Sequence, residues 1–360
     1  MIRRLLYGIG VLALMGFMAL VVVTIVYQRY LDTPIDPARA EPAVIKVPKG
    51  SLRDVMAVLV EHDLVKEPRW FEWHANLSGK ATQVKAGTFF FDYRWTPSEL
   101  LHHLVEGTSP ATRTVRIPRG SNQWRVAERV EKAGVGRSNR FLEVVKAPHL
   151  PDLLGLSVPR PTGTHLAKLD MSFRSPLEGY LFPGVYELPW ETSEEELIER
   201  ATQAFRRNWG EVKQANQKRM KELQTQFGFR EHDFVTLASI VEKEAVKDDE
   251  RPLIAGVFYN RMRDGWKLQT DPTLIYHPET YRDRPAPRHR KDRSKPYNTY
   301  AFKGLPPGPI SNPSRASLEA VLQPKKSPYF FFVARGDGSN RHAFSVTLDQ
   351  HRKNIRKGKK

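Results

Sequence analysis

The N-terminus carries an uncharged, mainly apolar run of 23 residues, Leu5 to Tyr27, behind the sequence Met-Ile-Arg-Arg. With a rise of about 1.5 Å per residue, a helix of this length crosses a hydrocarbon core of about 30 Å. A cleaved signal peptide usually has a shorter apolar part, of about 7 to 15 residues, with a small-residue cleavage site close behind it. The nearest such pattern, Ala38-Arg39-Ala40, lies well past the run. We therefore expect an uncleaved membrane anchor over residues 5–27, with a cleaved signal peptide or a buried core helix as the alternatives.

Basic residues on the two sides of the run indicate its orientation. Arg3 and Arg4 favour a cytoplasmic N-terminus over residues 1–4, although Arg29 and Arg39 weaken the contrast. The rest of the chain is then expected on the periplasmic or extracytoplasmic side of the cell inner (cytoplasmic) membrane.

The composition is typical of a globular protein, with an excess of positive charge. Its 360 residues include 57 Lys and Arg against 40 Asp and Glu, a formal net charge of +17. Such a charge attracts polyanions, namely nucleic acid, acidic lipid or an acidic cell-envelope polymer, and the expected extracytoplasmic place argues against nucleic acid. Because the chain has no cysteine, disulfide frameworks, thiolate nucleophiles and cysteine-based metal sites are excluded.

Proline-rich stretches and a faint repeat divide the chain behind the anchor. Residues 28–43 are typical of an extended linker. Residues 45–51 (IKVPKGS) recur as residues 115–121 (VRIPRGS), and each copy predicts a short strand, a turn and a Ser-capped helix. We therefore expect two small strand–helix modules, over 44–108 and over 109–163, the second of which ends in a proline-rich boundary.

A further helix is predicted from Asp233, a good N-cap, to Ala245. On a period of 3.6 residues, its buried stripe consists of Phe234, Leu237, Ala238, Val241 and Ala245. Lys243 points away from this stripe, and Glu242 and Glu244 fall on its opposite edges. Either glutamate could border a cleft, where partial burial raises a carboxyl pKa towards use as a general acid. The alternative is two solvated carboxylates on a surface helix, and periodicity does not choose between them.

Polar residues and turns are dense behind this helix, in residues 268–276, 297–300 and 304–313. Carboxamides, hydroxyls and aromatic rings on rigid turns suit the hydroxyl and acetamido groups of a sugar polymer. The sequence contains no His-Glu-x-x-His, Walker or Gly-x-Ser-x-Gly motif. Metal and serine-hydrolase chemistry therefore have no support in the sequence.

Four motifs occur in an order that resembles a known family. They are LASIVEKE at 237–244, QTDPT at 269–273, YNTY at 297–300 and GLPPGPI at 304–310. Residues 175–183 and 329–334 also fit. In these motifs, and over most of its length, the sequence is similar to the YceG-like (MltG) family of endolytic murein transglycosylases.

The resemblance implies an α+β fold with a single N-terminal transmembrane helix, a small LysM-like α/β module over 44–108 and a mixed α+β catalytic domain over 164–350. The composition of residues 351–360 predicts a basic tail behind that domain. The resemblance also implies an enzyme that cleaves nascent peptidoglycan strands between N-acetylmuramic acid and N-acetylglucosamine, forms a 1,6-anhydro-muramyl end and terminates strand elongation. No metal or cofactor is implied. The implied partners are peptidoglycan glycan strands and the membrane, with peptidoglycan synthases of elongation or division as candidates and no nucleic acid.

By the family's motif, the catalytic acid is the second glutamate of the Glu-Lys-Glu run, Glu244. Glu242 is expected to support it, and becomes the alternative acid if Glu244 is inert; Glu178 is a second candidate supporting carboxyl. Five residues match motif positions and are assigned to the cleft as substrate-positioning groups: Gln269, Asp271, Thr273, Tyr297 and Asn298. For each of the five, a hydrogen bond that stabilises a turn is the alternative.

The implied reaction explains why one carboxyl suffices. Ordinary glycosidases use two carboxyl groups, whereas a lytic transglycosylase uses the substrate's own C6 hydroxyl as the acceptor, so one residue acts first as acid and then as base. Two rival functions stay open. One is a non-catalytic, membrane-anchored peptidoglycan-binding or division-scaffold protein, and the other is a membrane-tethered nucleic-acid binder that only the net charge supports.

Overall fold

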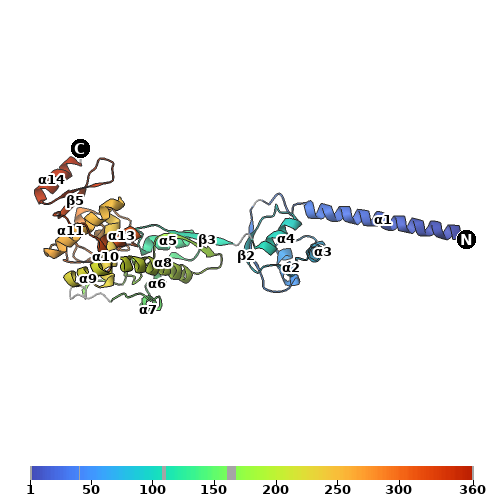
Figure 1. The fold of residues 1–360 in the computed structure, drawn as a ribbon, viewed down its shortest axis with the longest axis horizontal. Helices are drawn as coiled ribbons and strands as arrows, with labels where there is room; N and C mark the ends of the chain where they lie inside the picture. The colour runs from blue at the N-terminus through green and yellow to red at the C-terminus, as the bar shows by residue number, and fades with distance from the viewer. Residues whose placement is uncertain (1, 40, 108–110, 160–167, 359–360) are drawn as a thin grey trace. The chain divides into compact units, whose positions relative to one another are not determined.

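The computed structural model describes residues 2–39, 41–107, 111–159 and 168–358. The chain forms two compact units (Figure 1). The N-terminal unit comprises residues 1–112 with 189–191, and the C-terminal unit comprises residues 113–188 and 192–360.

Helix α1 (Ile2–Asp32) is the one helix in the described ranges that is long and apolar enough to cross a membrane, over Gly10–Asp32. Near its end the Tyr27 ring stacks on Trp70, with 5.5 Å between the ring centroids. Aromatic side chains of this kind gather at membrane–water interfaces. The helix is therefore consistent with the predicted membrane anchor, and a signal sequence would meet the same criteria.

The rest of the N-terminal unit follows the strand–helix pattern that the sequence predicts. Its elements are β1 (Ala43–Val47), α2 (Leu52–Glu61), α3 (Pro68–Leu77), β2 (Gly87–Phe91) and α4 (Pro97–Glu106). The two strands pair antiparallel, from Ala43 opposite Phe91 to Val47 opposite Gly87. All five elements contribute to one core, in which Leu59, Phe71 and Leu100 are fully buried.

Helix α4 illustrates how the local sequence sets these boundaries. The Thr96 hydroxyl accepts a hydrogen bond from the Glu99 amide at 3.2 Å, and the Glu99 carboxylate accepts one from the Thr96 amide at 2.8 Å. This reciprocal pair satisfies two amide groups that the start of a helix leaves free. The helix ends at Gly107, whose φ of 65° is a left-handed conformation that glycine adopts without strain.

The C-terminal unit combines many helices with two short sheets. Its α-helices are α5 (Gln123–Lys132), α6 (Ser138–Val144), α7 (Leu150–Leu153), α8 (Glu194–Ala215), α9 (Gln217–Phe227), α10 (Glu231–Glu244), α11 (Arg251–Arg263), α12 (Pro287–Lys291), α13 (Arg315–Leu322) and α14 (Leu348–Lys357). Two short 3-10 helices are η2 (Asp248–Glu250) and η3 (Asp271–Ile275). The sheets pair β3 (Thr112–Ile117) with β4 (Gly184–Pro189), and β5 (Phe331–Ala334) with β6 (His342–Ser345). This mixture agrees with the expected α+β class.

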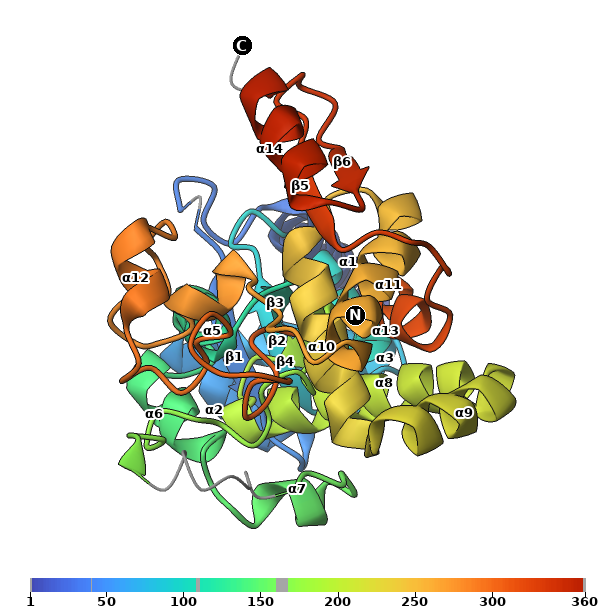
Figure 2. The same ribbon diagram turned by 90° about the vertical axis from the view of Figure 1, so that its left-hand side faces the viewer.

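Helix α10 packs against both α11 and α13 (Figure 2). Every residue from Phe234 to Glu242 is buried, so the predicted buried stripe is too narrow because neighbouring elements cover the helix on all sides. Lys243 is exposed, as predicted. The helix also starts at Glu231, two residues before the predicted start, and the Asp233 carboxylate accepts a hydrogen bond from the Arg230 amide at 2.7 Å.

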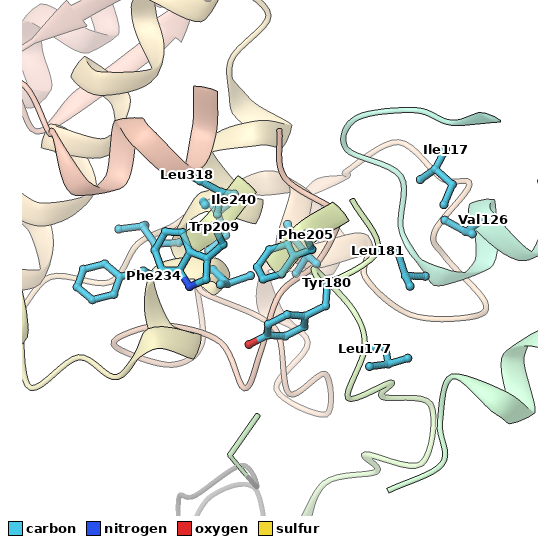
Figure 3. Packing of buried hydrophobic residues seen from close by; sticks show 14 of the residues in the cluster. Ile117, Val126, Leu177, Tyr180, Leu181, Phe205, Trp209, Phe234, Ile240 and Leu318 are labelled. Atoms are coloured by element: carbon cyan, nitrogen blue, oxygen red, sulfur yellow. The ribbon is translucent and has the colours of Figure 1, made fainter. Parts of the chain in front are cut away.

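One hydrophobic cluster joins α10 to elements from both ends of the C-terminal unit (Figure 3). The rings of Tyr180 and Phe205 meet edge to face at 4.9 Å, beside Phe234 of α10 and Leu318 of α13. Ile117 of β3 belongs to the same cluster. The strand and helices that we expected as a separate module over 109–163 therefore share the core of the C-terminal unit.

The other predicted domain limits stay predictions. Ala40 of the candidate cleavage pattern, the boundary at 108/109 and the boundary at 163/164 lie outside the described residues. The predicted basic tail over 351–360 is helical as far as Lys357, because it continues α14.

Candidate active site

Glu244 is the last residue of α10, and the chain leaves the helix at Ala245 in an extended conformation, with φ −95° and ψ 123°. A cavity of about 480 Å³ opens beside it. The polar side chains that line this cavity are Glu244, Arg261, Gln269, Asp271, Arg290, Tyr300, His342 and His351. Residues of β5 and α14, which lie in the last part of the chain, complete the lining of the cavity.

The surroundings of Glu244 favour its protonated form. Burial raises the pKa of Glu244, and the negative charge of Asp271 raises it further. The Thr270 hydroxyl, which donates a hydrogen bond to Oε1 of Glu244, lowers the pKa in opposition. A position at the C-terminus of a helix also disfavours negative charge. Glu244 is half-buried rather than solvated, so it has the properties of a general acid.

Residues of the YNTY motif hold the segment that contains Thr270 in place. The Gln269 amide donates to the Thr299 carbonyl at 3.2 Å, and the Thr270 amide donates to the Thr299 hydroxyl at 3.1 Å. Gln269 adopts a φ of 47°, a left-handed conformation that side chains other than glycine rarely take. Such strained backbone persists where surrounding contacts enforce it, and it is common at active sites.

Asp271 is held at the rim of the cavity by two side chains. The Tyr300 hydroxyl donates to its Oδ1 at 2.6 Å, and Nη2 of Arg290 lies 3.2 Å from its Oδ2. The Arg290 guanidinium also lies over the Tyr300 ring, 5.1 Å from the centroid. These contacts orient the Asp271 carboxylate while leaving it partly exposed to the cavity.

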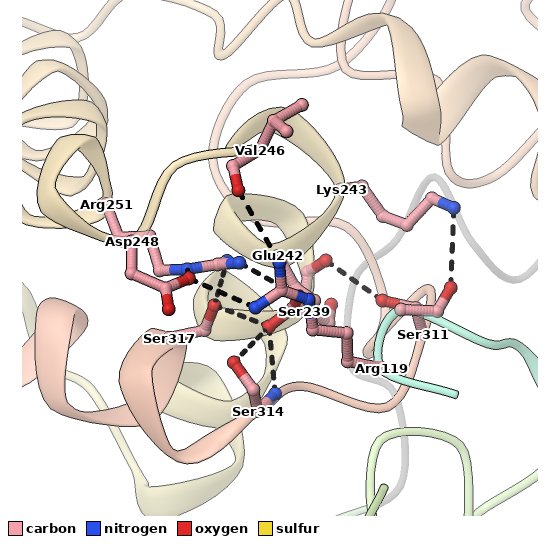
Figure 4. Close-up of polar contacts among 11 residues, drawn as sticks. Arg119, Ser239, Glu242, Lys243, Val246, Asp248, Arg251, Ser311, Ser314 and Ser317 are labelled. Atoms are coloured by element: carbon pink, nitrogen blue, oxygen red, sulfur yellow. Dashed lines mark hydrogen bonds and ion pairs between the residues drawn. The ribbon is translucent and has the colours of Figure 1, made fainter. Parts of the chain in front are cut away.

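Glu242, the other glutamate of the motif, is fully engaged in the protein interior (Figure 4). Its Oε1 lies 3.1 Å from Nη2 of the fully buried Arg251. Its Oε2 accepts hydrogen bonds from the Ser314 hydroxyl at 2.5 Å and from the Ser317 hydroxyl at 2.8 Å. The alternative of two solvated carboxylates is therefore wrong for both glutamates: one is locked in the interior and the other borders a cavity.

The predicted positioning residues fall into three groups. Gln269 and Asp271 line the cavity of Glu244. Thr273 and Asn298 are buried and stabilise the local chain: the Thr273 hydroxyl donates to the Thr270 carbonyl at 2.7 Å, and the Asn298 amide group donates to the Asp292 carbonyl at 2.6 Å. The fifth residue, Tyr297, lines a different cavity.

Glu178 does not line the cavity of Glu244 either. It is buried, and its Oε2 accepts hydrogen bonds from the Gln123 amide at 2.9 Å and from the Tyr276 hydroxyl at 2.8 Å. Burial raises the pKa of Glu178 to about 7. The structure therefore places this carboxyl in the core beside α5, where it joins segments that are distant in the sequence.

The sequence alone did not identify several of the residues that line the cavity. Thr270 and Tyr300 belong to motifs that the sequence did reveal, and only their individual roles were missed. Arg290 lies in residues 282–295, a stretch with seven Lys and Arg residues whose composition alone predicts a solvated basic loop. The remaining cavity residues carry no motif of their own in the sequence: Arg261, His342 and His351. Among the residues that the structure describes, no group of three or more His, Cys, Asp or Glu side chains is arranged to hold a metal ion.

Comparison with known proteins connects this geometry to a family. The model of the YceG-like family matches residues 45–357. A Bacillus subtilis (strain 168) protein named endolytic murein transglycosylase is 28% identical over 329 residues, which cover 91% of this chain and 88% of that protein. A Streptococcus pneumoniae protein of the same name is also 28% identical, over 86% of this chain and 57% of that longer protein. The crystal structure of a putative YceG-like protein from Listeria monocytogenes is similar, with a TM-score of 0.56 and 28% identity over 88% of this chain and 99% of that one.

The surroundings of the two glutamates predict effects of very different size on stability. We expect Glu242→Gln to lower the free energy of unfolding by about 3 kcal/mol, the lower end for a broken buried ion pair, because the Arg251 guanidinium keeps only the exposed Asp248 carboxylate as its charge partner. Glu244→Gln should change the free energy of unfolding by less than about 1 kcal/mol, because this side chain is half-buried and forms no ion pair with any described residue. Denaturant unfolding of the full-length protein in detergent measures both. Equal losses in the two variants would contradict the separate roles.

Proposed function

Since the chain belongs to the YceG-like family, we propose that it is a lytic transglycosylase that cleaves peptidoglycan glycan strands internally, with Glu244 as the catalytic acid. The observation that supports this most directly is a carboxyl with a raised pKa that borders an open cavity. The volume of the cavity lies within the range of small-ligand sites. The relatives described above carry the name of an enzyme, and nothing in their names favours the non-catalytic scaffold.

The first step requires a proton on Glu244. The glycosidic oxygen between N-acetylmuramic acid and N-acetylglucosamine accepts this proton as its bond to C1 of the muramic acid breaks, so that the leaving sugar departs as a neutral alcohol. The burial that raises the pKa of Glu244 keeps the proton available. The Thr270 hydroxyl holds the carboxyl in one orientation and stabilises the carboxylate that forms.

The second step reverses the role of the same group. The Glu244 carboxylate removes the proton from the C6 hydroxyl of the muramic acid, and the C6 oxygen bonds to C1 to close the 1,6-anhydro ring. Proton and charge balance without water as a reactant. A second carboxylate that activates water, as in hydrolytic glycosidases, is therefore unnecessary.

The substrate contacts that we propose follow from the lining of the cavity. Gln269 presents a carboxamide for sugar hydroxyl and acetamido groups, and Asp271 presents an oriented carboxylate. Thr273 and Asn298 act on the substrate indirectly, because they hold the segments on which these groups lie. The cationic groups of the lining, Arg261 and Arg290, suit a strand that carries carboxylates on its lactyl and peptide substituents.

We extend the proposal to the N-terminal unit. Helix α1 would anchor the protein in the inner membrane with the rest of the chain outside the cytoplasm, where nascent strands are made. Residues 44–108 would form a LysM-like glycan-binding module, for which the paired strands β1 and β2 and their connecting helices offer a compact scaffold. Peptidoglycan synthases of elongation or division would be the neighbours that supply the substrate.

Product analysis tests the reaction. We expect the full-length protein in detergent to convert purified glycan strands into fragments with 1,6-anhydro-muramyl ends, and Glu244→Gln to lower the rate by about 100-fold or more. Mass spectrometry of the fragments distinguishes the outcomes, because hydrolysis yields reducing ends that are one water heavier. Reducing ends from the wild type, or full activity of Glu244→Gln, would refute the proposal.

The pH dependence of the reaction tests the role of Thr270. Because Glu244 must start protonated, kcat/KM should fall as the pH rises through its pKa. The Thr270 hydrogen bond lowers that pKa, so Thr270→Val should move the falling limb of the pH profile to higher pH. Thr270→Ser keeps the hydroxyl and serves as the control, with a limb near that of the wild type. A limb that moves to lower pH in Thr270→Val would contradict this assignment.

Membrane placement is tested on cells. We expect the intact mass of the protein extracted from membranes to include residues 1–27, and external protease to digest the two units in spheroplasts. A cytoplasmic membrane protein of known topology is the control for leakage. A mass that lacks the apolar run would instead indicate a cleaved signal sequence, and protection from protease would indicate the opposite orientation.

A further inference from the structure

Helix α3 presents a mainly apolar face outside the core of the N-terminal unit. Phe71 and Ala75 of this helix lie in that core. A second stripe, which we call the α3 stripe, has the spacing i, i+3, i+4 and i+7 of one helix face and consists of Trp70, Trp73, His74 and Leu77. In this stripe Trp73 is 44% exposed and Leu77 is 63% exposed. Apolar side chains that gather on an exposed face indicate an interaction surface.

The α3 stripe packs against the end of α1. The centroid of the Tyr27 ring lies 4.6 Å from that of Trp73 and 5.5 Å from that of Trp70. The Tyr27 hydroxyl and Nδ1 of His74 form a hydrogen bond of 2.9 Å. The ring of Tyr30, nearly one turn later in α1, lies 6.2 Å from that of Trp70, which is near the start of α3. Helix α3 therefore runs from the level of Tyr30 towards the level of Tyr27, back along α1.

This direction sets the depth of the α3 stripe relative to the apolar run of α1. Tyr27 is the last residue of that run, so in the proposed anchor its ring lies at the membrane–water interface. Trp73 contacts Tyr27 and lies at the same level. Leu77 lies about one turn further along α3, which brings it up to about 6 Å closer to the hydrocarbon core.

The end of α1 is firmly joined to the rest of the N-terminal unit. The helix ends at Asp32, and Ile35, three residues later, already belongs to the core of the unit. The Ile35 amide donates to the Trp95 carbonyl at 2.9 Å, and the Asp36 amide donates to the Tyr93 carbonyl at 2.7 Å. Helix α1 also packs against α4. The unit therefore cannot swing away from the end of the apolar run without breaking these contacts.

The distribution of charge on α3 suits a place at the edge of a bilayer. Burial and the nearby charge of Lys80 lower the pKa of His74, which favours its neutral form, so the α3 stripe carries no charge. The side of the helix away from the stripe is exposed and polar, with Arg69, Glu72 and Asn76. Lys80 follows the helix, and a lysine next to an apolar surface can extend its ammonium group to lipid headgroups.

We propose that the end of α3 inserts Trp73 and Leu77 into the interfacial region of the bilayer that α1 spans, and so holds the N-terminal unit on the membrane surface. This inference rests on the membrane anchor proposed above. A tryptophan ring has an apolar body and one polar N–H group, which suits the headgroup level. The exposed part of the stripe adjoins the apolar run of α1, so lipid, rather than a second copy of the chain or another protein, is the partner that this position favours.

Fluorescent labels at single sites test the proposal. Because the chain has no cysteine, one introduced cysteine carries the only label. The variants are Leu77→Cys in the α3 stripe, Glu72→Cys on the polar side of the same helix as the matched control, and Phe17→Cys near the middle of the apolar run as the reference for the bilayer. Each full-length variant carries the environment-sensitive fluorophore NBD and is reconstituted into vesicles of phosphatidylethanolamine and phosphatidylglycerol.

Quenching of each label reports its depth. We expect lipids with a nitroxide in the upper part of the acyl chain to quench the label at Leu77→Cys, and aqueous iodide to quench it little. The label at Glu72→Cys should show the reverse. The label at Phe17→Cys should be quenched most strongly by lipids with the nitroxide at the end of the acyl chain.

The intrinsic fluorescence of the protein provides a second measurement without a label. Lipids that are brominated in the upper part of the acyl chain should quench part of the tryptophan fluorescence of the wild type. Trp73→Phe should lower the quenched intensity, because it removes a ring that we place at that level. Trp266→Phe removes a tryptophan of equal exposure, 44%, from the C-terminal unit and controls for the loss of one fluorophore.

The outcomes separate this inference from the proposed anchor. A label at residue 77 that only iodide quenches, while the label at residue 17 is quenched by lipid, would overturn the inference and leave the anchor standing. A label at residue 77 that neither quencher reaches would mean that protein covers the α3 stripe, which also overturns it. If iodide quenches the label at residue 17, the anchor fails and the inference fails with it. An unchanged quenched intensity in Trp73→Phe would likewise contradict the insertion of that ring.

Discussion

The buried ion pair between Glu242 and Arg251 is the contact on which the geometry of the C-terminal unit depends. It joins the last turn of α10 to the first turn of α11, and the hydroxyls of Ser314 and Ser317 connect α13 to the same carboxylate. A buried charge pair is tolerated only when its hydrogen bonds are nearly complete. This requirement fixes the position of the end of α10. Because Glu244 lies two residues after Glu242, the same contact also fixes Glu244 at the cavity.

A second constraint acts from the opposite side of the cavity. Thr299 binds the backbone of Gln269 and Thr270, and Thr270 in turn binds Glu244. The acid is therefore oriented by a chain of hydrogen bonds that starts in a buried segment. The neighbouring residues of that segment line different cavities: Tyr300 lines that of Glu244, and Tyr297 lines the one beside His232. One short stretch of backbone thus forms a wall of both.

The sequence was informative where a property is local or repeated, and less so where it depends on distant contacts. The apolar run, the strands and helices that follow the repeated segments 45–51 and 115–121, and the place of Glu242 and Glu244 at the end of one helix can be predicted from the local sequence. The complete burial of α10 does not, because it results from α11 and α13 lying on its outer faces. Motifs led to Gln269 and Asp271, but Arg261 and His342 reach the cavity through tertiary packing of β5, β6 and α14, which leaves no pattern near them in the sequence.

Glu242 and Glu244 have the same side chain and only Lys243 between them, yet the fold buries the first in an ion pair and places the second at a cavity. The walls around Glu244 come from β5 and α14 at the end of the chain, which do not contribute to the Glu242–Arg251 pair. Substitutions in those walls can therefore accumulate without loosening the lock that positions the acid. The position of the acid and the shape of the cavity are thus set by different parts of the chain, so a change in these walls can alter which strands fit without moving the acid.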